Sequence, residues 1–224
     1  RNEDMEPQTR ATDENSIRDV NYYLIGSEYK EVIHGYERSA DLRFECPPVT
    51  YDVYVVANIH SDLGVKTAQE LRDMTLDYDY QYDDLPMWAK QTISIPSRNN
   101  GNLYRLPAIT VKRGLAKVAV NVRSEVSDII LKSVRMVCIP RVSRPFAENP
   151  SPSTIRSDYT QGPITYFPAY EESYSEVYYL PENLQGERPD ITDETQKVPE
   201  NAPKYATYLL IRADKEGVAL AYRI

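Results

Sequence analysis

The chain has 224 residues, enough for one large domain or two small ones, and 41% of them are hydrophobic. Its formal net charge of −8 disfavours nucleic acid as a partner, because an acidic surface repels a phosphate backbone. There are 16 prolines and only 8 glycines, and no run of about 18 apolar residues, which argues against long helices, glycine-rich nucleotide loops and a membrane-spanning segment.

Alternation of apolar and polar residues with a period of two dominates the first part of the chain. Strands are expected over residues 19–26 and 31–39, and a third over 49–58. In the third, alternate apolar residues share one face: Val49, Tyr51, Val53, Val55 and Ala57. Strands of this kind bury one face and pair antiparallel. One short helix is expected over residues 67–74, with Thr67 as its N-cap and Glu70 completing a capping box.

The same period-two pattern continues at residues 115–125 and 129–140. In the second of these runs, the apolar face is expected to hold Ile130, Val134, Met136 and Cys138. After Pro140 the chain becomes rich in proline and serine and weakly periodic, which is typical of a linker or an irregular crossing segment. Strand-like runs return near the C-terminus, at residues 175–183, 204–213 and 217–224.

These patterns predict an all-β fold, mostly antiparallel. We expect a flexible N-terminal segment over residues 1–16, an N-terminal β-sandwich over 17–146 and a C-terminal β-rich domain over 147–224. The C-terminal domain has few strands for a sandwich of its own. Either it is truncated or the strands that it lacks come from elsewhere.

Residues 75–88 form a run of acidic and tyrosine residues that ends at the only tryptophan. Its carboxylates belong to Asp77, Asp79, Asp83 and Asp84. An EF-hand loop is excluded, because the sixth and twelfth positions counted from Asp77 are not the glycine and glutamate that such a loop needs. A different calcium site, a glycosidase-type carboxylate pair and a solvated surface segment stay open, and the solvated segment is favoured. A glycan-binding patch of aromatic rings is a further hypothesis, and its members are Tyr78, Tyr80, Tyr82 and Trp88.

The residues of common catalytic and metal sites give little support to an enzyme. Cys46 and Cys138 leave a disulfide open, although the apolar run around Cys138 favours a small core residue. His34 and His60 are the only histidines, and neither has a ligand-like partner nearby in the sequence, so we expect no zinc and no other cofactor. Motifs for nucleophilic catalysis are lacking, and the prediction is a protein that is not an enzyme.

Five segments, in order along the chain, resemble the fimbrillins of the Bacteroidales, which are subunits of type V pili. They are residues 9–26, 51–62, 84–96, 109–122 and 177–186. The resemblance implies two transthyretin-like β-sandwiches in tandem. It also implies a structural or adhesive fimbrial subunit that assembles by β-strand complementation, with other fimbrial subunits as partners in a homo- or heteropolymer. Host or bacterial surface proteins or glycans are further partners that it suggests.

The resemblance also implies export as a lipoprotein precursor and a place in fimbriae associated with the outer membrane at the cell surface. An arginine-specific protease would then remove a first strand, and Arg10–Ala11 matches the family's processing step. Residues 1–8 have no alternating apolar side chains and cannot supply that strand, so it is expected to be missing already. The alternative function is a monomeric carbohydrate-binding protein of the cell surface.

Overall fold

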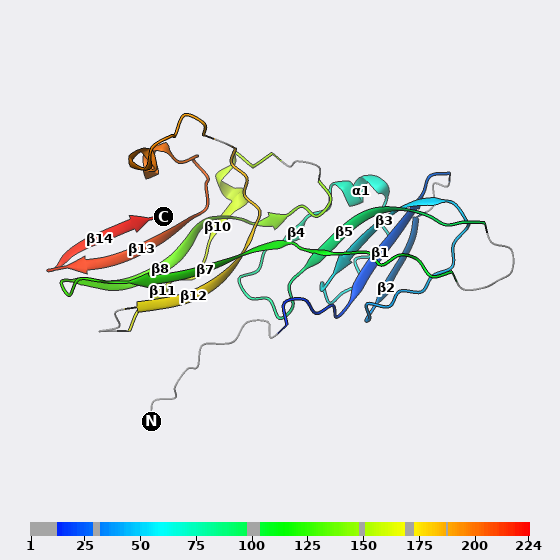
Figure 1. Ribbon diagram of the computed structural model, residues 1–224, viewed down its shortest axis with the longest axis horizontal. Coiled ribbons are helices and arrows are strands. Elements are labelled where there is room, and N and C mark those ends of the chain that lie inside the picture. The colour runs from blue at the N-terminus through cyan, green and yellow to red at the C-terminus, as the bar shows by residue number, and fades with distance from the viewer. Residues whose placement is uncertain (1–12, 29–31, 98–103, 148–150, 169–172, 187) are drawn as a thin grey trace, which may run out of the picture. The chain divides into compact units, whose positions relative to one another are not determined.

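The computed structural model describes residues 13–28, 32–97, 104–147, 151–168, 173–186 and 188–224, and β-strands dominate it (Figure 1). The strands pair antiparallel, which confirms the predicted fold class. The chain divides into two compact units. The first comprises Arg1–Gly114 with Arg144–Glu148, and the second comprises Leu115–Ser143 with Asn149–Ile224.

The first unit is built on one five-stranded sheet with the strand order β2-β1-β3-β5-β6. Its strands are β1 (Val20–Gly26), β2 (Val32–Glu37), β3 (Thr50–Ala57), β5 (Met87–Ser94) and β6 (Lys112–Arg113). The expected strands at residues 19–26, 31–39 and 49–58 are therefore confirmed as β1, β2 and β3. A short strand, β4 (Leu76–Asp77), precedes β5 in the chain.

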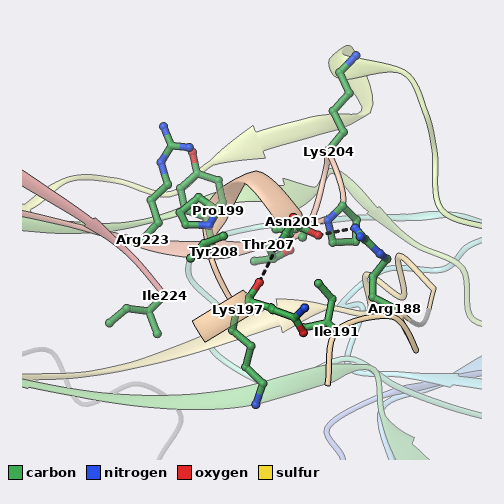
Figure 2. Close-up of a pocket in the computed structure, with 15 residues that line it drawn as sticks. Arg188, Ile191, Lys197, Pro199, Asn201, Lys204, Thr207, Tyr208, Arg223 and Ile224 are labelled. Carbon is green, nitrogen blue, oxygen red and sulfur yellow. Dashed lines mark hydrogen bonds between the residues drawn. The ribbon is translucent and has the colours of Figure 1, made fainter. Parts of the chain in front are cut away.

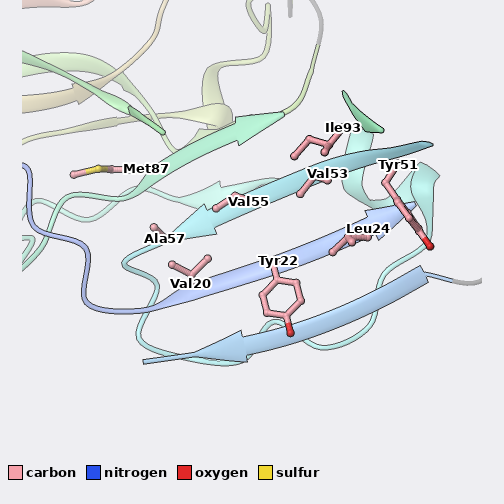
Figure 3. Packing of buried hydrophobic residues seen from close by; sticks show 9 residues of the cluster. All are labelled: Val20, Tyr22, Leu24, Tyr51, Val53, Val55, Ala57, Met87 and Ile93. Carbon is pink, nitrogen blue, oxygen red and sulfur yellow. The ribbon is translucent and has the colours of Figure 1, made fainter. Parts of the chain in front are cut away.

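Both faces of this sheet carry apolar residues. One face holds the first core cluster, whose buried members are Val20, Tyr22, Leu24, Tyr51, Val53, Val55, Ala57, Met87 and Ile93 (Figure 3). On the other face Tyr23, Tyr54 and Val56 pack with Leu71 of the helix and with Phe146. The prediction of a single buried face is therefore wrong for β3, because a helix and a loop cover its second face.

The one α-helix, α1 (Ala68–Arg72), forms where the sequence predicts it, within the described residues. The Thr67 hydroxyl accepts a hydrogen bond from the Glu70 backbone N–H at 3.2 Å, and the Glu70 carboxylate accepts one from the Thr67 N–H at 2.7 Å. This is the expected capping box, which satisfies two backbone donors at the start of the helix.

The second unit has a larger and a smaller sheet. The larger follows the order β10-β8-β13-β14, with β11 also paired to β8, and the smaller is β12 paired with β7. The strands are β7 (Leu115–Arg123), β8 (Ile129–Pro140), β10 (Tyr159–Gln161), β11 (Thr165–Tyr166), β12 (Ser173–Pro181), β13 (Tyr208–Lys215) and β14 (Val218–Arg223). The short strand β9 (Val142–Ser143) and the 3₁₀ turns Arg156–Asp158, Glu194–Gln196 and Pro199–Asn201 complete the described elements.

The division between the units differs from the expected boundary after residue 146. That boundary assigned β7 and β8 to the first domain, whereas β7 pairs along its whole length with β12, and β8 pairs with β10, β11 and β13. The strands that the C-terminal domain lacked thus come from residues 115–140. Periodicity identifies a strand but not its partner, which is why the sequence misplaced both strands.

Strand β8 does not keep the expected face over its whole length. Its pairing with β13 shifts between Arg212 and Ala213, and Leu131 is buried where Ile130 was expected. Near its other end Cys138 has a left-handed φ of 58°, and both Val137 and Cys138 are buried. An extra residue in one strand moves the side chains that follow it to the opposite face.

The disulfide that the sequence left open does not form in this structure. Cys46 and Cys138 are free thiols. No helix in the described part of the chain is long and apolar enough to cross a membrane.

Candidate functional site

The three tyrosines of the predicted glycan-binding patch lie together, but their rings do not form one flat surface. Tyr78 and Tyr80 are 5.3 Å apart between ring centroids with an interplanar angle of 80°, and Tyr78 and Tyr82 are 6.2 Å apart at 49°. All three are half-buried. Trp88 of β5 is half-buried as well, and its ring packs against Gly114. Stacking on a sugar ring needs a flat exposed face, so this arrangement favours packing over glycan binding.

The acidic residues of the same segment differ in their surroundings. Asp84 lies 3.3 Å from the Arg18 side chain and 3.5 Å from Nε2 of His60, whereas Asp77, Asp79 and Asp83 are exposed. The described residues contain no group of three or more His, Cys, Asp or Glu side chains that could hold a metal ion. The Asp84 carboxylate therefore belongs to a network of ion pairs.

The predicted processing step, Arg10–Ala11, lies outside the described residues. Asn58, which comes directly after β3, forms hydrogen bonds with the chain that follows this processing step. The Asn58 side chain accepts a hydrogen bond from the Arg18 N–H at 2.8 Å and donates to the carbonyls of Ser16 and Leu85 at 2.9 and 2.8 Å. Asn58 has a φ of 63°, which asparagine tolerates better than most residues.

Asp19, directly before β1, forms a second set of hydrogen bonds near the start of the described chain. It is buried, and one carboxylate oxygen accepts hydrogen bonds from the backbone N–H groups of Ile59 and His60, both at 3.1 Å. The other oxygen lies 2.8 Å from Nδ1 of His60. Sequence reasoning missed this network, because its partners are about 40 residues apart and only the fold brings them together.

The second histidine is also held by a carboxylate. Nε2 of His34 lies 2.7 Å from Asp62, and the imidazole stacks on the Tyr23 ring at 4.5 Å. The Gly64 N–H, and after it the His34 side chain, hold the pKa of Asp62 below its ordinary value. Both histidines thus stabilise the loop that follows β3.

The face of the first unit's sheet that carries the first core cluster is covered by described segments that are not themselves strands of a sheet. Leu42, Phe44 and Cys46 pack against the cluster and are half-buried, whereas Arg43 and Glu45 between them are exposed. The Phe44 ring lies 5.6 Å from the Tyr22 ring. Burial that alternates residue by residue is typical of a strand lying on a core.

A second segment covers the same face. Leu106, Ile109 and Val111 are half-buried against the cluster. Within the described residues, neither 41–46 nor 105–111 belongs to any strand pair. We call these two stretches the cover segments. They place apolar side chains on the core, but no sheet joins them, so a strand could pair its backbone with them.

A pocket of about 580 Å³ lies in the second unit, beside the end of β14 (Figure 2). Its basic lining residues are Arg188, Lys197, Lys204 and Arg223. Of the described residues that line it, none is acidic. Arg188 is held by Asp190 at 2.8 Å, and Arg223 lies over the Tyr208 ring at 5.5 Å. Lys197 and Lys204 extend away from each other on either side of the pocket (Figure 2).

Comparisons with known proteins bear on the fold. A family model described as a domain of unknown function, DUF4906, matches residues 178–224. No curated protein matches the sequence. Among solved structures, the tip fimbrial protein Mfa3 from Porphyromonas gingivalis is 16% identical, with a TM-score of 0.56 over 96% of this chain and 79% of that one.

Two further solved structures are similar. A fimbrial assembly protein from Parabacteroides distasonis is 12% identical, with a TM-score of 0.50 over 96% of this chain and 80% of that one. A candidate adhesin from Bacteroides ovatus is 10% identical, with a TM-score of 0.52 over 93% and 76%. These likenesses confirm the fimbrillin-like fold that the resemblance implied.

Proposed function

We propose that the protein is a structural or adhesive subunit of cell-surface fimbriae, that it assembles with other fimbrial subunits by β-strand complementation, and that it is not an enzyme. The observation that carries this proposal is the cover of the first core cluster. Two segments, of which the first alternates in burial, lie on that face, and no sheet joins them within the described residues. The fimbrillin-like fold supports the same function.

An incoming strand would bind this face for two physical reasons. Its backbone N–H and C=O groups would pair with those of a cover segment, and its alternate side chains would add to the apolar cluster. The half-buried Phe44 and Leu106 then lose their remaining contact with water, and burial of apolar surface favours binding by about 25 cal/mol per Å². The donor is a strand of a neighbouring subunit.

The proposal extends to processing and location. Cleavage after Arg10 by an arginine-specific protease would release the first ten residues, while Asn58 and Asp19 hold the chain from Ser16 onward. Export as a lipoprotein precursor would bring the subunit to the outer membrane before assembly. Host or bacterial surface proteins or glycans are contacts of the finished fimbria.

The test compares the full-length precursor, which still carries the first strand that the family scheme implies, before and after treatment with an arginine-specific protease, using light scattering and negative-stain microscopy. Trimmed wild-type protein is expected to form filaments or ladders, whereas Arg10→Lys stays uncut at this step and forms neither. Phe44→Asp is expected to be trimmed but not to assemble, because a carboxylate on the apolar face opposes strand binding. Arg43→Gln, on the exposed side of the same segment, is the matched control and assembles normally.

The proposal fails if trimmed wild-type protein forms no filaments or ladders at any concentration. It also fails if Phe44→Asp assembles as readily as Arg43→Gln while both remain folded by circular dichroism. In the first case a carbohydrate-binding monomer becomes the better hypothesis.

A further inference from the structure

Strand β14 is at the end of its sheet, and within the described residues only β13 pairs with it. Leu209 and Ile224 exchange both backbone hydrogen bonds, at 2.8 and 3.0 Å. Because hydrogen-bonded and non-bonded pairs alternate in an antiparallel ladder, the even-numbered residues of β14 also point their N–H and C=O groups at β13. Ala219, Ala221 and Arg223 therefore direct theirs at the open edge.

This edge lacks the usual protection against pairing. Proteins guard edge strands with lysine, proline, bulges or inward-pointing charges. In β14 the only charged residue is Arg223, and one row of side chains is apolar throughout: Val218, Leu220, Tyr222 and Ile224. Leu220 and Tyr222 lie opposite the buried Ala213 and Ile211, on the same face of the sheet. Even so, Val218, Tyr222 and Ile224 are 62%, 45% and 78% exposed.

The edge is complementary to itself in one register. Outward-pointing groups must meet outward-pointing groups, so an added antiparallel strand has to set odd residues opposite odd residues. For a second copy of β14, a two-fold axis through Ala221 does this and uses every residue from Val218 to Ile224. Ala221 then faces Ala221 of the second copy, and Ala219 faces Arg223. The two apolar rows join on one face of a continuous sheet.

The charges at the two ends of β14 are complementary under the same axis. The pocket beside Arg223 and Ile224 has a basic lining. At the other end of the strand, the turn from β13 carries the exposed Glu216, and Lys215 there is paired with Asp128 at 2.9 Å. In this register Ile224 lies opposite Val218 of the second copy, so the acidic turn of each copy lies just beyond the end of its partner's strand, next to the basic pocket.

From these observations we propose that two copies of this chain associate through their β14 edges, antiparallel about a two-fold axis at Ala221, with the Glu216 turn of each copy against the basic pocket of the other. An isologous interface uses the same patch on both subunits, as this one does. The pairing joins only one short strand of each copy, and small interfaces form weak complexes, so we expect the dimer to be reversible and to depend on concentration. This interface is separate from strand complementation in the first unit and does not rest on it.

The first test fixes the register by cross-linking. In Ala221→Cys the two Cα atoms of the dimer are about 5.5 Å apart, as in any hydrogen-bonded antiparallel pair, and a disulfide spans about 4.4–6.8 Å. In Ala219→Cys the two equivalent atoms are more than about 13 Å apart and cannot be joined. Under mild oxidation the Ala221→Cys chain is expected to give a covalent dimer well above the Ala219→Cys chain. Wild-type protein, with its native Cys46 and Cys138, gives the background.

The second test measures association by sedimentation velocity over a range of concentrations, on protein that has not been treated with protease. Ala221→Pro removes the outward N–H but leaves the β13 pairing intact, and loss of the two central hydrogen bonds is expected to weaken the dimer at least about tenfold. Ala221→Thr keeps the N–H and is the matched control. Glu216→Lys is expected to weaken association, and so is added salt.

Wild-type protein that is monomeric at all concentrations overturns the proposal, as does equal cross-linking of the two cysteine variants. A dimer that Ala221→Pro and Ala221→Thr form equally well overturns it too, because the interface then lies elsewhere. Since untrimmed protein is used, none of these results depends on whether filaments form after trimming.

Discussion

At the scale of single residues, Gly114 leaves very little room for a side chain. A Cβ atom there would lie 1.9 Å from ring atoms of Trp88, and the Gly114 N–H donates to the Pro86 carbonyl at 2.9 Å. Gly114→Ala is expected to lower the free energy of unfolding by about 1–3 kcal/mol, because the indole must move from its place beside the core. Urea unfolding followed by the fluorescence of the only tryptophan measures this.

The control for that substitution is Gly162→Ala in the second unit, where a Cβ would meet nothing nearer than 3.5 Å. Its unfolding, followed by circular dichroism, should change little. Equal destabilisation by both substitutions would mean that loss of glycine, and not the contact with Trp88, is responsible.

Glu216 adopts a conformation that glutamate disfavours. It has a φ of 52° and is followed by Gly217 at 83°, in the two-residue turn that joins β13 to β14. Asparagine tolerates the left-handed region, and Asn-Gly is the favoured pair for such hairpins. Glu216→Asn is expected to raise the free energy of unfolding by about 0.5–1 kcal/mol, measured at a concentration where the chain is monomeric. Glu216→Gln removes the same charge without the conformational preference, and a gain of equal size in that variant would refute the explanation.

At the scale of elements, the capping box of α1 links helix stability to pH. The pKa of Glu70 lies below its ordinary value of 4.5. The main cause is the hydrogen bond from the Thr67 backbone N–H, and the Thr67 side chain adds to it. Because the folded pKa is the lower one, the stabilisation is present above about pH 4.5 and disappears as the pH falls through the folded pKa. Wild-type protein is therefore expected to be more stable than Glu70→Gln at pH 6, with a gap that closes toward pH 3. A gap that is constant across this range would contradict the role of the ionised carboxylate.

The elements that the sequence predicted well are those whose signal is local. The capping box at Thr67 and Glu70 lies within four residues, and the apolar pattern that predicts β3 and β8 lies within single strands of eight and twelve residues. The buried face of a strand was predicted less well than the strand itself. In β8 a bulge buries Leu131 in place of Ile130, and no local sequence pattern marks that bulge. The partners of β7 and β8 are set by contacts far apart in sequence, and periodicity carries no information on those.

The candidate site shows the same limit. Leu42, Phe44 and Cys46 alternate with charged residues, so the first cover segment had a visible strand-like signal that went unused. The second has Pro107 within it, which weakens any strand pattern. The Asp19–His60 pair was beyond reach, because it depends on two loops that only the folded sheet brings together.

At the scale of the whole molecule, the order of the chain does not follow the order of the units. Residues 115–143 enter the second unit, 144–148 return to the first, and the rest of the chain belongs to the second. Phe146 illustrates the return, since its ring packs edge-on against Tyr54 with centroids 4.9 Å apart. A cut placed by composition alone, after residue 146, separates β12 and β13 from the strands that pair with them.

This arrangement predicts which fragment of the second unit folds. In residues 147–224 alone, β10, β11 and β12 have lost their partners, and a single hairpin of β13 and β14 is marginal in water. Residues 115–224 restore β7 and β8, with β8 as the strand that pairs β10, β11 and β13. The longer fragment is expected to unfold cooperatively by circular dichroism and the shorter to show no transition. A cooperative transition in the shorter fragment would mean that β8 is dispensable and would return the boundary to residue 146.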